Sequence, residues 1–122
     1  MTDERALILR TAELAADYLG TLDTRPIRPE HGYAEMHARF DAPVPEHPSE
    51  SLAVIEELAA DAEPGLTAMG SGRYFGFVIG GSVPSSTAAD MLVTAWDQNT
   101  GLAEPTPATS AIEAVAGRWV IE

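Results

Sequence analysis

Proline placement constrains this chain more than any other feature of its sequence. Five of its nine prolines lie between residues 21 and 48, where each one removes a backbone N–H that a helix or a sheet would need. We therefore expect residues 21–48 to form an extended, irregular segment with one short helix, around residues 33–40. Of the later prolines, Pro84 and Pro107 stand at first helical positions, where proline is favoured.

Apolar residues at helical spacing predict four longer helices on either side of this segment. These helices cover residues 3–20, 49–61 and 84–99, and a last stretch that starts at residue 106. The candidate N-caps of the first three are Thr2 or Asp3, Ser49 and Ser82. The fold is thus expected to be mainly α, with four to five helices plus the proline-rich extended segment.

Two of these helices carry apolar faces that we expect to be buried. In helix 49–61 the inward residues are Leu52, Ile55, Leu58 and Ala59, and in the last helix they are Ile112, Val115, Trp119 and Val120. The last helix still runs at Glu122 with Trp119, Val120 and Ile121 displayed at its end. Apolar area of this kind is normally covered, so we expect a partner surface there.

The stretch between the second and third of these helices contains an aromatic and β-branched run, residues 74–79. This composition is typical of a buried strand or a tightly packed extended segment. We therefore expect the aromatic side chains Tyr74, Phe75 and Phe77 to pack in the core.

Charge and composition exclude several classes of protein. The net charge of -12 at pH 7 argues against binding to nucleic acid or to an anionic membrane surface, which attract basic proteins. The chain has no cysteine, which excludes disulfides and thiolate metal sites. No window approaches the roughly 20 apolar residues of a membrane span, and the N-terminus is not a secretory signal, so a cytoplasmic location is expected.

No constellation of catalytic or metal-ligating residues stands out. The three histidines, His31, His37 and His47, lie in the proline-rich segment, without the ordered spacing of zinc ligands. Glu56 and Glu57 are adjacent on a predicted helix and point about 100° apart, so they are expected on a solvated face. We predict no catalytic residue, no cofactor-binding residue and no metal site within this chain.

Four sequence blocks occur in the order and with the gaps of a known family. They are RYFGFVIGGSVP (73–84), AADML (88–92), WDQN (96–99) and TPATSAIE (106–113). With these blocks the chain resembles the N-terminal part of the group II pyridoxal-phosphate-dependent decarboxylases, the family of the aromatic-L-amino-acid and glutamate decarboxylases. The resemblance covers nearly the whole chain and only the first quarter or so of such an enzyme.

The resemblance implies a place for each part of the chain in a larger enzyme. The parent would have the α/β fold of fold-type I pyridoxal phosphate enzymes and would be a homodimer. Residues 1–48 would be a leading helix and a proline-rich strap that pack against the second subunit. Residues 49–122 would be helices that flank the pocket-lining segment RYFGFVIGG.

The resemblance also implies which residues touch the substrate. The segment that matches Phe77, Val78, Ile79 and Gly80 lines the substrate pocket in this family, and the turn that matches Asn99 to Gly101 reaches into the neighbouring subunit's pocket. The candidate pocket residues are Phe77, Val78, Ile79, Gly80, Asn99 and Gly101. Because Asn99 and Gly101 replace bulky apolar residues of the aromatic relatives, a roomier and more polar pocket is implied.

One absence limits what the chain can do by itself. All seven basic residues are arginines, and there is no lysine, whereas the family holds pyridoxal phosphate as a Schiff base on a lysine amine, which arginine cannot replace. The expected function is therefore that of the N-terminal part of an amino-acid decarboxylase, contributing dimer interface and pocket wall and not catalytic alone. The alternative is a standalone, non-catalytic helical module that binds a protein partner.

Overall fold

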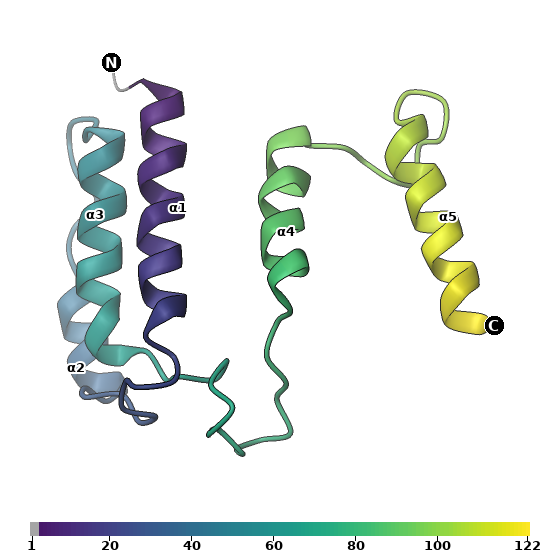
Figure 1. Ribbon diagram of the computed structural model, residues 1–122. Helices are drawn as coiled ribbons and strands as arrows, with labels where there is room; N and C mark the ends of the chain where they lie inside the picture. Colours follow the sequence, from purple (N-terminus) through teal and green to yellow (C-terminus); the bar gives the residue numbers. More distant parts are fainter. Residues whose placement is uncertain (1–2) are drawn as a thin grey trace. The chain divides into compact units, whose positions relative to one another are not determined.

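The computed structural model describes residues 3–122, which form five α-helices and no strand (Figure 1). The helices are α1 (Glu4–Gly20), α2 (Tyr33–Phe40), α3 (Ser51–Ala62), α4 (Pro84–Trp96) and α5 (Pro107–Ile121), with a single 3-10 turn, η1 (Glu63–Gly65). The chain divides into two compact units, the first ending at Gly81 and the second running from Ser82 to Glu122. The expected mainly α fold, with a short helix inside the proline-rich segment, is confirmed.

The first two long helices begin with side-chain caps, one of which differs from the prediction. Asp3 accepts a hydrogen bond from the backbone N–H of Arg5 at 3.0 Å, as expected of an N-cap, while Thr2 lies outside the described residues. Ser49 is not the cap of α3. The helix begins two residues later, and the Glu50 carboxylate takes the capping role by accepting from the N–H of Ala53 at 3.0 Å.

Helix α4 begins where predicted and ends earlier. Pro84 occupies its first turn, but Val83 stands at the N-cap position, and Ser82 is not a cap, since its hydroxyl lies 3.1 Å from that of Thr87. The helix stops at Trp96 rather than at Asn99 because Asp97 adopts a left-handed conformation, with φ of 48°.

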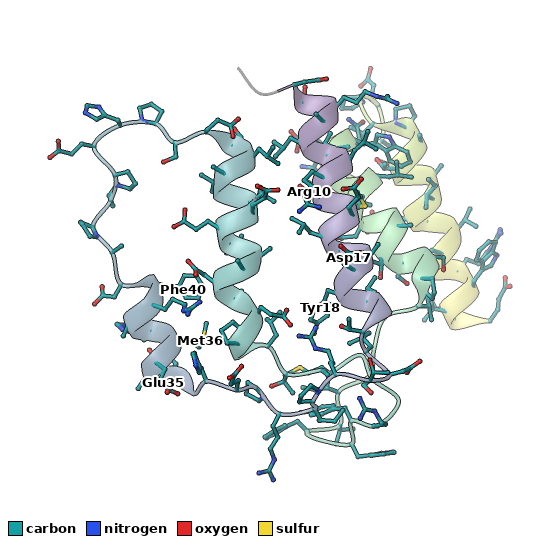
Figure 2. The ribbon with its side chains drawn as sticks, turned by 60° about the vertical axis from the view of Figure 1, so that its left-hand side comes forward. Arg10, Asp17, Tyr18, Glu35, Met36 and Phe40 are labelled. Carbon is teal, nitrogen blue, oxygen red and sulfur yellow. The ribbon has the colours of Figure 1, made fainter. Side chains whose placement is uncertain are left out.

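In the first unit α3 lies between α1 and α2 (Figure 2), and an ion pair joins it to each of them. Arg10 Nε of α1 lies 2.9 Å from Glu56 Oε1 of α3, and Arg39 Nη1 of α2 lies 3.0 Å from Asp61 Oδ1 of α3. The hydrogen bond to Glu56, and a second one to Glu13, raise the pKa of the Arg10 guanidinium above its ordinary value. Three helices distant in sequence are thereby held in one layer.

A single layer of helices leaves little room for a core. Among the residues that the structure describes, only Ala68 and Ser71 are buried. The predicted inward face of α3 is only partly covered, with Leu58 still 53% exposed.

The apolar face of α5 is open to solvent, so the prediction that it is buried is wrong. Ile112 is 61% exposed, Trp119 69% and Val120 87%, and Val115 also remains exposed. None of residues 82–122, all of which the structure describes, is buried. The physical reason is that burial needs a facing surface, and periodicity within a helix does not supply one.

No helix among residues 3–122 combines the length and the apolar character that crossing a membrane requires.

Candidate functional site

The predicted pocket-lining run lies in a closed loop, not in a strand. Tyr74 N–H donates to the Ser71 carbonyl at 3.0 Å and Ile79 N–H to the Gly76 carbonyl at 3.3 Å, which are turn interactions. A Cβ placed on Gly81 would lie 3.5 Å from the Cα of Gly70, so the two ends of the loop touch. Residues 70–81, called the apolar loop from here on, therefore form a compact loop of the Ω type.

The tip of the apolar loop points its large side chains into solvent. Phe75 is 92% exposed, Phe77 89% and Val78 fully exposed, so the expectation of core packing is wrong for both phenylalanines, whereas Tyr74 is half-buried. Aromatic and β-branched residues favour strands because they fit a pleated, half-buried surface. The first unit offers no sheet for that fit within its described residues, and the backbone is satisfied by turns instead.

The backbone at the tip is strained. Phe77 and Val78 have φ of 56° and 54°, in the left-handed region that non-glycine residues rarely adopt and that is unusual above all for a β-branched side chain. The cost is about 1–2 kcal/mol for each residue. At Gly76 a Cβ would lie 2.7 Å from Cζ of the Tyr74 ring, so a larger residue there would require the ring to move.

The other predicted pocket residues, Asn99 and Gly101, form a turn between α4 and α5. The Asn99 side-chain oxygen accepts from Gly101 N–H at 3.0 Å, and the Asn99 carbonyl accepts from the Thr106 hydroxyl at 2.6 Å. These bonds fix the turn locally. The structure thus gathers Phe77, Val78, Ile79 and Gly80 in the apolar loop of the first unit, and Asn99 and Gly101 in one turn of the second.

A groove that sequence reasoning missed runs between α1 and α3. It is an open, mostly apolar cavity of about 680 Å³, with Leu14, Tyr18 and Ile55 among its lining residues. Figure 2 shows Arg10 and Tyr18 on α1, and both side chains line this groove. The sequence does show an apolar face on each of the two helices. It does not show that these faces lie opposite one another, because that depends on tertiary contacts.

The base of the groove is organised by Arg25. Its guanidinium forms an ion pair with Glu63 and lies 4.3 Å from the centre of the Tyr18 ring, a cation–π arrangement. The Arg25 side chain is only 11% exposed. Nothing in the local sequence around Arg25 distinguishes it from the other arginines.

Two of the α2 side chains that Figure 2 labels, Glu35 and Met36, have structural partners. Glu35 accepts a hydrogen bond from Gly32 N–H at 2.8 Å and so caps its own helix. Met36 packs against η1, where a Cβ on Gly65 would lie 2.7 Å from its Cγ. No three acidic or histidine side chains of residues 3–122 gather in a way that could hold a metal ion.

The residues present do not fit pyridoxal phosphate as a resident cofactor. The chain has no lysine amine for the aldehyde. Five of the seven arginines have protein partners: Arg10, Arg25, Arg39 and Arg118 pair with carboxylates, and Arg73 donates to backbone carbonyls. No chemical step through this cofactor can therefore be assigned to residues of this chain.

The chain has a distant relative among proteins of known function. The chain is 22% identical over 122 residues to tryptophan decarboxylase 1 of Oryza sativa subsp. japonica, an alignment that covers 98% of this chain and 23% of the relative. The aligned part is the N-terminal quarter of that protein. No family model matches the chain, and no solved structure matches it.

The chain spans less than a quarter of the length of this relative. The alignment confirms the resemblance that the four sequence blocks indicated. The chain is distantly similar, over almost its whole length, to the N-terminal region of an aromatic amino-acid decarboxylase.

Proposed function

We propose that the chain is the N-terminal segment of a pyridoxal-phosphate-dependent amino-acid decarboxylase, in which it supplies dimer surface and part of the substrate-pocket wall. The observation that carries the proposal is the near-complete alignment of the chain with the N-terminal quarter of tryptophan decarboxylase 1. A match that covers 98% of this chain and only 23% of the relative is what an N-terminal segment of such an enzyme would give.

The exposure of apolar side chains supports a role at an interface. On α4, Val93 is 60% exposed and Trp96 50%, and on α5, Trp119 is 69% exposed. Large exposed apolar side chains gathered on a few helices are characteristic of protein interfaces. In the proposed enzyme the remaining segments and the second subunit cover it.

The apolar loop is the proposed wall of the substrate pocket in its own subunit, and the Asn99–Gly101 turn is proposed to reach into the pocket of the neighbouring subunit. Phe77 and Val78 present apolar side chains with no cover of their own, which suits contact with the carbon skeleton of an amino-acid substrate. Asn99 and Gly101 add little bulk, so the wall they form leaves space for a polar substrate group. Cleavage of the bond between the α-carbon and the carboxylate then depends on groups outside this chain. The chain itself would bind and orient the substrate.

The exposed end of α5 favours a second candidate function, a standalone helical module that docks on a protein partner. Trp119, Val120 and Ile121 are between 69% and 88% exposed. The two candidates differ in one decisive way, because a module needs no further enzyme segment joined to it.

The mass of the native product separates the two. Trypsin would release residues 74–118 as one peptide, since no arginine or lysine lies between Arg73 and Arg118, and this peptide identifies the product in the source cells. We expect a protein about four times the 12.9 kDa of this chain, because the chain spans 23% of the relative. We also expect the purified product to release CO2 from an amino acid when pyridoxal phosphate is supplied. A product of 12.9 kDa would exclude the decarboxylase segment and favour the module.

A further inference from the structure

One guanidinium ties the start of the apolar loop to a distant part of the first unit. Arg73 Nη2 donates to the carbonyl of Arg25 at 2.7 Å and to the carbonyl of Leu22 at 3.1 Å, which are 48 and 51 residues away in the chain. Hydrogen bonds from a charged donor are stronger than neutral ones. A single side chain therefore ties the start of the loop to the segment that follows α1.

The contacts of Arg73 lie beside the two buried residues of the described chain, Ala68 and Ser71. Ala68 is 0% and Ser71 5% exposed, and no other described residue is buried. Ala68 N–H donates to the Ile27 carbonyl at 3.1 Å, and the Ser71 hydroxyl accepts from Arg73 N–H at 3.2 Å. Arg73 thus joins Ser71 to the Leu22 and Arg25 carbonyls, next to the buried Ala68. These residues are called the root of the apolar loop from here on.

The loop tip lies close enough to this root to depend on it. Only three residues separate Arg73 from Phe77, and the opposite end of the loop returns to Gly70. Gly70 itself packs on the Leu22 side chain, since a Cβ there would lie 3.2 Å from Leu22 Cδ1. Left-handed backbone at non-glycine residues persists only where the surrounding structure determines it, and the root fixes the two ends of the loop that contains Phe77 and Val78.

We propose that Arg73 is a positioning residue of the candidate substrate pocket: by holding the loop root on the Leu22 and Arg25 carbonyls, it sets the conformation in which Phe77 and Val78 are presented. The pocket role rests on the proposed function, whereas the anchoring is a property of this chain. Arg73 does not itself reach the substrate, and its effect passes through the loop backbone.

The test replaces Arg73 by methionine in the full 122-residue chain, which keeps an aliphatic stem and removes the donors. Hydrogen exchange at the Ala68 amide reports the root. Fluorine NMR of the chain labelled with fluorophenylalanine reports the tip, because the three phenylalanines are Phe40 on α2 and Phe75 and Phe77 in the loop. For Arg73→Met we expect Ala68 exchange to be faster by about ten-fold or more. The Phe75 and Phe77 resonances should shift while that of Phe40 stays.

Two further variants separate positioning from general destabilisation. Arg28→Met is the matched control, because Arg28 lies in the same segment and forms no side-chain hydrogen bond or ion pair in the described structure. It should leave both readouts unchanged. Arg73→Lys keeps the charge and a donor on a shorter stem and should restore part of the Ala68 protection.

The inference is overturned if Arg73→Met leaves Ala68 exchange and the Phe77 resonance as they are in the wild type. It is also overturned if the Phe40 resonance moves together with those of Phe75 and Phe77, because Arg73 would then act on the whole unit. A failure of the proposed function would appear in the mass of the native product and leave this pattern intact, so the two failures are distinguishable.

Discussion

The two units differ in how their helices are connected. In the first, ion pairs join residues far apart in sequence, Arg10 with Glu56 and Arg39 with Asp61. In the second, the one ion pair of the described residues, Arg118 with Glu122, joins neighbouring turns of a single helix at 3.8 Å. Both units contain well-formed helices, so helix formation in this chain does not require long-range contacts. The contacts between helices are what distinguish the first unit.

The hydrogen bonds outside the helices show the same contrast. In the first unit the Ala68 amide reaches the Ile27 carbonyl and Arg73 reaches the Leu22 carbonyl, across 41 and 51 residues. In the second unit the longest side-chain bond, from the Ser110 hydroxyl to the Thr100 carbonyl, crosses 10 residues. We infer that the first unit has a tertiary structure of its own, whereas the helices of the second need a surface to pack on.

The largest expected effect comes from placing a proline inside one helix of each unit. Ala59→Pro in α3 and Ala114→Pro in α5 each remove a helical hydrogen bond and clash with the preceding turn, at a local cost of about 3 kcal/mol or more. Because α3 joins α1 and α2, Ala59→Pro should also expose the amides of α1 to exchange. Ala114→Pro should reduce the helical signal by α5 alone.

Circular dichroism with residue-resolved hydrogen exchange measures both responses. If α1 amides stay as protected in Ala59→Pro as in the wild type, the first unit is not held together through α3 and the contrast between the units is lost.

A smaller effect is expected from removing one arginine of each unit. Arg25→Met abolishes the pair with Glu63 and the cation–π contact with Tyr18, and should lower the stability of the first unit by about 1 kcal/mol. Arg118→Met removes an exposed pair within one helix and should cost no more than about 0.5 kcal/mol.

Urea unfolding can be assigned to each unit, because both tryptophans, Trp96 and Trp119, lie in the second one. Arg25→Met should shift the unfolding of α1 amides to lower urea and leave the tryptophan signal unchanged. Equal shifts for the two variants would contradict the claim that Arg25 has a tertiary role that Arg118 lacks.

The sequence predicted the helices well because the signals for a helix are local. Proline positions and apolar spacing located α2 at its observed bounds and placed the starts of α4 and α5. The errors at the ends arise where neighbouring residues compete, as when Glu50 rather than Ser49 caps α3, and where Asp97 turns left-handed and ends α4.

Burial and the candidate site were predicted less well because they depend on what faces each residue. The strand-like composition of residues 74–79 does not reveal that the run closes into a loop whose phenylalanines point outward. The contacts of Arg25 and Arg73 join segments that no spacing rule connects. The resemblance named the pocket residues, and their role remains part of the proposed function.

The central claim is that the apolar faces of this chain, above all those of α4 and α5, need a cover that the chain does not supply. Static light scattering of the purified 122-residue chain, combined with a calorimetric scan, tests it most directly. The account predicts self-association, or a monomer without a sharp transition for the whole chain. A monomer that unfolds in one sharp, cooperative transition, with Trp96 and Trp119 fluorescence changing at the same temperature, would contradict it.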